Sequence, residues 1–319
     1  MYELYAQLEP LIIKIQLITA MFGMGCVMGL ADFLKIVRHP SGVALGVGTQ
    51  WLVVPFIGQA FVWAFDLGPG WAIGLLILTA IPGGAFSNLL TFLARGHTPL
   101  SIAITLVSTL CCIFSAPILL KIFAGSHVPA DFHFPVGRVI YEVLLYLVVP
   151  LGLGMLVCHF IPGRSPLVSK VAIWASMGFV SLLAVGALGT GKIQVAQYGW
   201  TPPLMLLLFG LVIHLASMEF FHAVGRTDDE VVAIGIEVSV RNGGVGLLLA
   251  GFFFIDPATG KHLPEYYKII YTILFYVGVQ IIIPLPILFR HRFGRSPLPF
   301  RRPRRPPPAP SNVEQPSQP

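Results

Sequence analysis

The stretch "IEVSVRNGGVGLLLAG" (residues 236–251) places polar groups inside an otherwise apolar segment. Glu237, Arg241 and Asn242 fall within it, and two glycines follow them directly. A charged residue at the centre of a membrane helix costs about 2.5–3.5 kcal/mol on insertion scales, so it is expected to face a cavity and to have a partner. If the chain spans a membrane, this stretch predicts a functional interruption of a helix.

The composition of the whole chain is that of a membrane protein. Of its 319 residues, 55% are hydrophobic and only 11% are charged, and the mean hydropathy is +0.81. Soluble domains have roughly 25% charged residues, so we predict an all-α protein that crosses a lipid bilayer several times. The net charge of +6 does not indicate a nucleic-acid partner, because seven arginines are concentrated between Arg290 and Arg305.

Apolar runs of about 20 residues, separated by glycine, proline and charged residues, predict nine transmembrane helices within residues 1–290. The expected limits of these helices are 11–30, 42–65, 71–94, 98–122, 139–160, 167–189, 200–222, 230–254 and 266–290. The first run is expected to be a retained helix rather than a signal peptide.

Basic residues gather in alternate connections and at the C-terminal end. The positive-inside rule then puts the N-terminus outside and the C-terminus in the cytoplasm. Residues 291–319 are rich in arginine and proline, which predicts a disordered basic cytoplasmic tail. The membrane is expected to be a plasma membrane or a bacterial inner membrane.

The third expected helix has a similar interruption in "TAIPGGAFSNLLTF" (residues 79–92), where Pro82 removes a backbone donor and two glycines follow. Broken helices expose carbonyls and helix ends that bind ions, and they occur only where they line a cavity or are buried in protein. The two interruptions lie five helices apart, so their helices run in opposite directions. This pattern favours an inverted-repeat transporter, and the alternative is a pair of coincidental kinks in a structural bundle.

Oxygen-bearing side chains cluster at and near these interruptions. Glu237 is the one carboxylate well inside an expected helix, and Ser101 and Thr105 share a helix face because they are four residues apart. With Ser87 and Asn88 they could form an oxygen cage for Na⁺. Taken singly, the hydroxyls could instead bond to their own backbone, and Asn88 or Gln50 could join two helices. The sequence contains no motif that indicates an enzyme.

Three segments resemble the bile acid:sodium symporter family. They are "PGGAFSNLLTFLARGHTPLSIAITLVSTL", "EVSVRNGGVGLLLA" and "MGCVMGLADFLKIVRHPSGVALGVGTQWLVVP". The resemblance implies a panel domain of helices 11–30, 139–160 and 167–189. It also implies a core domain of the other six helices, 42–65, 71–94, 98–122, 200–222, 230–254 and 266–290, in which two discontinuous helices cross. Family members couple the movement of organic anions, such as bile acids, steroid sulfates or smaller carboxylates, to sodium entry.

The resemblance also implies the positions of one or two Na⁺ ions. The residues that match the first sodium site are Ser87, Asn88, Ser101, Thr105 and Glu237. The residues that match the second are Gln50, Glu237, Val238 and Val240, and Arg241 stands where many relatives have glutamine. Ala85, Arg241, Asn242 and Gln280 match positions near the substrate. Ala85 replaces a usual threonine, and Val279 and Gln280 replace a usual His-Asn pair, so bile acid itself is not expected as the substrate.

Arg241 has three possible roles at this stage. Its guanidinium could occupy or repel the second sodium and neutralise part of the Glu237 charge, helped by an i,i+4 spacing if the helix continues there. It could instead bind the carboxylate or sulfate of a substrate, or form a plain structural ion pair. Three functions also stay open: sodium-coupled uptake of an organic anion, sodium-independent anion transport with Arg241 replacing a sodium, or a transport-inactive membrane sensor or scaffold on the same fold. The oligomeric state stays open.

Overall fold

The computed structural model describes residues 2–29, 40–128, 135–190, 198–255 and 262–298, without the side chains of residues 2–7 and Ala85. Within these ranges the protein is all-helical, and its only strand-like pairings are two isolated bridges. Seven helical segments are long and apolar enough to cross a membrane. The prediction of an all-α polytopic membrane protein is therefore confirmed.

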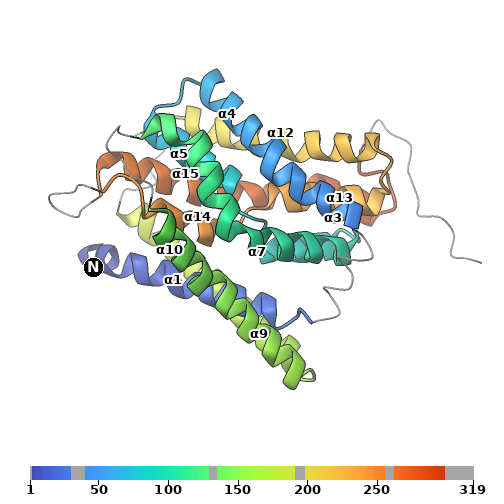
Figure 1. The fold of residues 1–319 in the computed structure, drawn as a ribbon. Coiled ribbons are helices and arrows are strands. Elements are labelled where there is room, and N and C mark those ends of the chain that lie inside the picture. Colours follow the sequence, from blue (N-terminus) through green and yellow to red (C-terminus); the bar gives the residue numbers. More distant parts are fainter. Residues whose placement is uncertain (1, 30–39, 129–134, 191–197, 256–261, 299–319) are drawn as a thin grey trace, which may run out of the picture.

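The seven long segments are single helices or helices joined end to end (Figure 1). They are α1 (Tyr2–Gly25), α3 (Pro40–Gly48) with the π-helix η1 (Thr49–Val53) and α4 (Val54–Ala64), α7 (Thr98–Phe123), α8 (Val136–Val143) with the π-helix η3 (Leu144–Val148) and α9 (Val149–Phe160), α10 (Ser165–Gly189), α12 (Thr201–Ala223), and α15 (Pro264–Ile282) with α16 (Leu285–Arg292). A short 3₁₀ turn, η2 (Gly125–His127), follows α7.

The predicted limits agree with these segments to within a few residues, except at α1. This helix begins at Tyr2 and ends at Gly25, so the predicted range of 11–30 is shifted toward the C-terminus. Residues 2–9 contain good helix formers, and Pro10 is accommodated inside the helix. The other end follows from packing, because Gly25 lies directly against the backbone of Leu151 and Gly154 on α9.

Two further helices are interrupted where the sequence predicted. The first consists of α5 (Pro69–Ala80) and α6 (Ala85–Leu93), and the second of α13 (Asp228–Ser239) and α14 (Gly243–Ala250). The interruptions lie side by side as a short antiparallel bridge between Gly83 and Arg241. The two breaks therefore meet at a crossing near the middle of the structure.

Each interruption satisfies backbone groups that the other leaves unpaired. The amide of Gly84 donates to the carbonyl of Val240 at 3.3 Å, and the amide of Asn242 donates to the carbonyl of Pro82 at 3.0 Å. Unpaired backbone groups are costly away from water. The paired breaks therefore stabilise one another inside the bundle.

Helices α1, α9 and α10 pack together along one side of the molecule (Figure 1). Small residues allow this close approach, which is how helices commonly associate in membranes. Ser169 on α10 donates to the carbonyl of Gly23 at 2.6 Å, and Ser165 donates to the carbonyl of Cys26. The Gln16 amide also donates to Ser176 at 3.0 Å, so side chains on α10 bind along much of α1.

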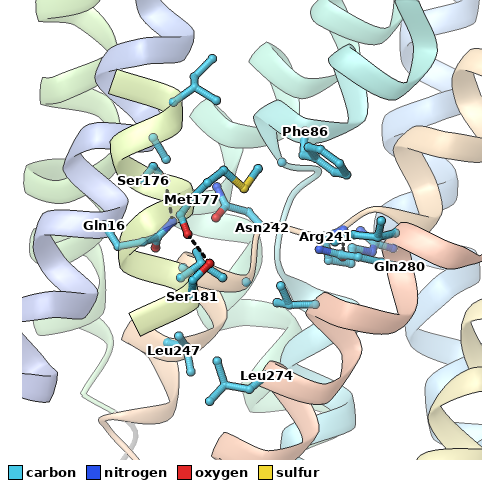
Figure 2. A pocket seen from close by; sticks show the side chains of 18 of the residues that line it. Gln16, Phe86, Ser176, Met177, Ser181, Arg241, Asn242, Leu247, Leu274 and Gln280 are labelled. Carbon is cyan, nitrogen blue, oxygen red and sulfur yellow. Dashed lines mark hydrogen bonds between the residues drawn. The ribbon is translucent and has the colours of Figure 1, made fainter. Parts of the chain in front are cut away.

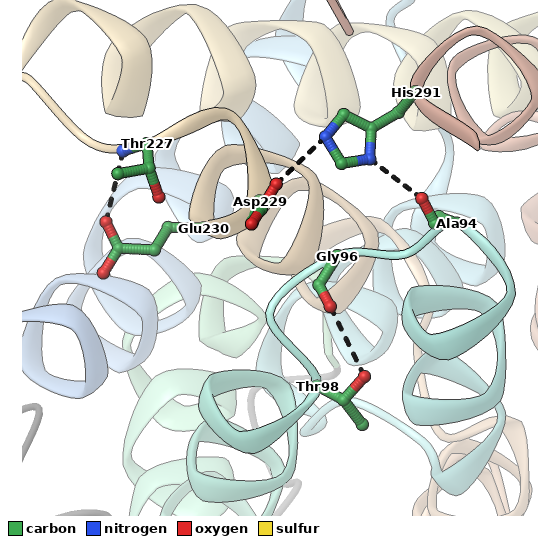
Figure 3. A network of polar contacts seen from close by, with 7 residues as sticks. All are labelled: Ala94, Gly96, Thr98, Thr227, Asp229, Glu230 and His291. Atoms are coloured by element: carbon green, nitrogen blue, oxygen red, sulfur yellow. Dashed lines mark hydrogen bonds and ion pairs between the residues drawn. The ribbon is translucent and has the colours of Figure 1, made fainter. Parts of the chain in front are cut away.

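A polar network joins the C-terminal end of α6 to the N-terminal end of α13 through α16 (Figure 3). His291 has Nδ1 2.8 Å from the carbonyl of Ala94 and Nε2 3.2 Å from the carboxylate of Asp229. His291 therefore lies between two hydrogen-bond acceptors, one from each interrupted helix region. Arg292 also donates to the carbonyl of Leu93 at 2.9 Å.

His291 and Arg292 belong to α16 and thus extend helical structure two residues beyond the predicted domain end at 290. The rest of the predicted tail from 299 to 319 lies outside the described residues.

Candidate functional site

Glu237 lies in the last turns of α13, immediately before the crossing, and is fully buried. Its carboxylate accepts three hydroxyl hydrogen bonds. Ser87 of α6 donates to Oε2 at 2.6 Å, Ser101 of α7 donates to Oε2 at 2.9 Å, and Thr105 of α7 donates to Oε1 at 2.6 Å. Residues from three helices therefore converge on one carboxylate.

Asn88 completes this group. Its Oδ1 lies 2.8 Å from the Ser101 hydroxyl and 3.3 Å from the Thr105 hydroxyl. The structure thus brings together Ser87, Asn88, Ser101, Thr105 and Glu237, the five residues predicted for the first sodium site, and we call them the oxygen cluster.

The oxygen cluster contains more acceptor oxygens than its hydroxyl hydrogens can satisfy. Each hydroxyl has a single hydrogen. Ser101 Oγ nevertheless lies within hydrogen-bond distance of both Asn88 and Glu237, and Ser87 Oγ is 2.6 Å from the carbonyl of Gly84 as well as 2.6 Å from Glu237. Surplus lone pairs around a buried carboxylate are the ligands that a hard cation prefers, so the residues fit Na⁺ chemically.

Gly83 is required by the close approach of the two interruptions. A Cβ atom built at this position would overlap Oε1 of Glu237. At Gly84 a Cβ would meet its nearest neighbour, the carbonyl of Arg241, at an ordinary 3.5 Å. Of the two glycines, the first is therefore the one that makes room for the carboxylate.

The residues predicted for a second sodium site lie around the other side of Glu237. Gln50 belongs to the π-helix η1, and its amide donates to the main-chain carbonyl of Glu237 at 3.3 Å. Its Oε1 is buried and has no hydrogen-bond partner among the described residues. Val238 and Val240 are both fully buried, and the Val240 carbonyl accepts from Gly84. The geometry joins Gln50 to Glu237 but builds no closed cage.

Arg241 lies at the crossing and is 2% exposed. Its backbone amide donates to Oε1 of Gln280 at 2.7 Å, and its Nη1 donates to the carbonyl of Ile81 at 3.0 Å. That carbonyl follows the C-terminal end of α5, where the helix dipole is negative and attracts a cation. Within the described part of the chain, Nε and Nη2 have no hydrogen-bond partner.

The predicted helical pairing of Glu237 with Arg241 is not formed. Helix α13 ends at Ser239, so the i,i+4 geometry does not extend to Arg241. The two side chains form no ion pair within 4.0 Å, although they lie within electrostatic range. The direct structural ion pair, one of the three roles considered for Arg241, is therefore not formed, and the guanidinium is held by a carbonyl instead.

A cavity of about 210 Å³ lies between the crossing and helices α1 and α10 (Figure 2). Its wall at the crossing contains Arg241, Asn242 and Gln280. Asn242 caps α14, because its Oδ1 accepts from the amide of Val245 at 3.4 Å. The remaining predicted substrate residue, Ala85, is the first residue of α6, and its side chain is outside the description.

Sequence reasoning missed polar residues on the opposite wall. Gln16 and Ser176 line the cavity from α1 and α10 and hydrogen-bond to each other. A lone amide in the first apolar run was a signal for Gln16.

Two polar residues near the crossing were also not predicted. Thr91 donates to Ser101 at 3.3 Å, and Tyr276 donates to the carbonyl of Ser239 at 2.8 Å. Threonine and tyrosine are common in apolar helices, so the sequence did not distinguish these two.

Comparison with known proteins identifies the family of the chain. The model of the sodium bile acid symporter family matches residues 14–197, which is more than half of the chain. The chain belongs to the sodium bile acid symporter family. The matched region includes the first interruption and the four oxygen-cluster residues on α6 and α7.

Individual relatives come from several kingdoms. An uncharacterized sodium-dependent transporter of Bacillus subtilis is 29% identical over 73% of this chain and 72% of its own length. The human ileal sodium/bile acid cotransporter is 32% identical over 67% of this chain and 60% of its own. A probable chloroplastic sodium/metabolite cotransporter of rice is 29% identical over 75% of this chain and 58% of its own. The chain thus spans less than two thirds of the length of the human and rice members of this symporter family.

Proposed function

We propose that this protein is a secondary transporter that couples the movement of an organic anion to Na⁺. The observation that supports this most is the oxygen cluster around the fully buried carboxylate of Glu237. It lies at the crossing of two interrupted helices, beside a cavity of about 210 Å³. Sodium dependence is named for relatives from Bacillus to mammals.

Sodium at the oxygen cluster would do two things. It would neutralise a carboxylate whose burial is otherwise costly. It would also hold α6, α7 and α13 together, because its ligands come from all three helices. The bound ion therefore stabilises one arrangement of the crossing, and the adjoining cavity wall is formed by that same crossing.

We propose that one Na⁺ accompanies each transport cycle and that Arg241 takes the place of a second ion. The guanidinium is fixed by the carbonyl of Ile81 within electrostatic range of Glu237. A permanent positive charge there repels a second cation from Gln50 and the nearby main chain. A fixed charge cannot be released into the cytoplasm, so it contributes no coupling energy.

The substrate class follows from the cavity. A volume of about 210 Å³ is below the ~300–1,000 Å³ of pockets that bind drug-sized ligands, which favours a small carboxylate over a steroid. Asn242 and Gln280 would supply polar contacts near the positive charge of Arg241, and Ala85 would border them. Met21, Phe86 and Leu274 form apolar walls for the rest of the molecule.

Alternating access is proposed as rocking of α1, the joined segment α8–η3–α9 and α10 against the remaining helices. The cavity lies between these two bodies, so their movement would open it to either side. In this scheme the seven long segments and the two interrupted helices make nine crossings arranged as an inverted repeat. The N-terminus would lie outside and the C-terminus in the cytoplasm.

Uptake by the reconstituted full chain tests the function. Radiolabelled pyruvate, butyrate, benzoate and taurocholate would be offered with and without an inward sodium gradient. The expected result is sodium-driven uptake of a small carboxylate that is lost in Glu237→Gln, with Glu219→Gln as a control carboxylate outside the oxygen cluster. Uptake that ignores sodium in both proteins supports sodium-independent transport, and no uptake of any anion supports a sensor or scaffold.

A further inference from the structure

A second cavity of about 130 Å³ lies at the end of the bundle where α8 and α15 begin. Its walls come from α1, α8, α14, α15 and the segment that follows α14. Leu247 lines both this cavity and the central one, so the two spaces share one wall residue. We call it the outer cavity, in keeping with the proposed orientation.

Lys14 is the most unusual residue of the outer cavity. It is the only charged residue between Leu11 and Leu30, and it lies inside a helix apolar enough to span a membrane. Its ammonium group is 5.2 Å from the centre of the Tyr146 ring. No carboxylate among the described residues lies within 4.0 Å of it. An ionisable residue in a membrane helix generally marks a site for a ligand or an ion.

A second cation lies across the same cavity. Arg138 forms an ion pair with Glu142 at 3.2 Å, and its guanidinium lies over the ring of Phe252 at 5.5 Å. Glu142 is the only carboxylate among the described residues that line the cavity, and Arg138 already engages it. Among these described residues, the ammonium of Lys14 therefore adds a positive charge without a carboxylate partner.

We propose that the outer cavity binds the carboxylate of an organic anion between Lys14 and Arg138, with the apolar part of the ligand against Leu247 and Leu248. The charges supply electrostatic attraction that concentrates anions at the site. The apolar walls supply contact for a ligand body. This chemistry selects small monocarboxylates over neutral molecules of the same shape.

The outer cavity would then be the first binding site that a transported anion occupies. Lys14 and Gln16 are two residues apart on α1 and line the outer and the central cavity respectively. An anion passing Leu247 would move from Lys14 toward Arg241. This role in entry rests on the proposed transport function, whereas binding to the outer cavity does not.

Binding of 4-fluorobenzoate to the full chain in nanodiscs of uncharged lipid tests the site. Fluorine NMR titration in sodium-free buffer gives the affinity, and 4-fluorobenzyl alcohol is the neutral control ligand. We expect Lys14→Gln to weaken benzoate binding by about tenfold or more, as loss of one ion-pair partner does. We expect Lys14→Arg to restore it. Lys268→Gln is the matched control, because Lys268 lies at the same end but pairs with Glu265 at 2.6 Å.

Two results would overturn the proposal. Equal benzoate affinity in the unmodified chain and Lys14→Gln would remove the role of the ammonium group. Equal affinity for the alcohol and the benzoate would show that the outer cavity binds ligands through apolar contacts alone. The same titration in Glu237→Gln separates this site from the transport function. Benzoate binding that persists there, in a chain without sodium-driven uptake, supports the outer cavity even if the transport proposal fails.

Discussion

The crossing of the interrupted helices and the group α1, α9 and α10 pack helices closely in two different ways. Both bring helix backbones close together inside an apolar structure. At the crossing, backbone groups freed by two interruptions pair with each other beside a buried carboxylate. In the group α1, α9 and α10, continuous helices approach at glycines and are joined by serine hydroxyls such as that of Ser169.

This comparison distinguishes polar side chains that stabilise the fold from polar side chains that can bind a ligand. Serines such as Ser169 donate to a backbone carbonyl. Ser101, by contrast, lies between two side-chain acceptors and has hydrogen for one. Polar residues of the same type therefore have different consequences in the two regions, and substitutions can test this.

The largest effect is expected from Gly83→Ala. The added methyl group would overlap the carboxylate of Glu237, and overpacking of this kind costs typically about 1–3 kcal/mol. We expect loss of sodium-dependent uptake and a lower unfolding temperature. Gly84→Ala is the matched control, because its Cβ has 3.5 Å of space. Equal damage from both substitutions would show that the overlap with Glu237 is not what matters.

The next largest effect is expected from Ser101→Ala compared with Ser169→Ala. Both remove one buried hydroxyl, and each loses a hydrogen bond worth about 0.5–1.5 kcal/mol of stability. Ser101→Ala is expected also to raise the sodium concentration for half-maximal uptake by about tenfold, since a ligand of the ion is lost, corresponding to about 1.4 kcal/mol. Ser169→Ala should leave that concentration unchanged. A similar sodium curve for the two variants would contradict the assignment of Ser101.

Arg241→Gln is expected to change the shape of the sodium dependence. The substitution removes the fixed charge and adds an amide oxygen near Glu237, whose main-chain carbonyl accepts from Gln50. The Oε1 of Gln50 has no partner among the described residues. A second ion can then bind, so the Hill coefficient of uptake against sodium should rise from about 1 toward 2. A coefficient that stays the same would show that Arg241 does not stand in for a second sodium.

The smallest effect is expected from His291→Gln. Glutamine can donate to the carbonyl of Ala94 or to Asp229, so it keeps part of the contact that His291 makes. Because Asp229 is 41% exposed, the loss should be at most about 1 kcal/mol of stability. Thermal unfolding checks the change, and the sodium dependence of uptake should be unaltered. A large shift in that dependence would mean that the ends of α6 and α13 control the sodium site.

Much of the crossing could be predicted from the sequence because its signals are local. Pro82 with two glycines, and Asn242 with two more, mark the interruptions, and Glu237 is conspicuous in an apolar run. The grouping of Ser87, Asn88, Ser101 and Thr105 on this carboxylate was also anticipated, although their role with sodium stays a prediction.

The positions that depend on packing could not be predicted. The i,i+4 pairing of Arg241 with Glu237 depended on the helix continuing, but the helix ends first and the guanidinium binds the Ile81 carbonyl instead. Lys14 is an isolated charge in an apolar run of the sequence, and only the fold places it in the same cavity as Arg138. The end of α1 likewise depends on contact with α9, which is distant in the sequence.

The most direct test of the account is the number of sodium ions bound by the oxygen cluster. Equilibrium dialysis with ²²Na⁺ would be performed on the purified full chain and on Glu237→Gln. We predict saturable binding of about one ion per chain that disappears in the variant. Saturable binding that survives Glu237→Gln, or no saturable binding in the unmodified chain, would contradict it.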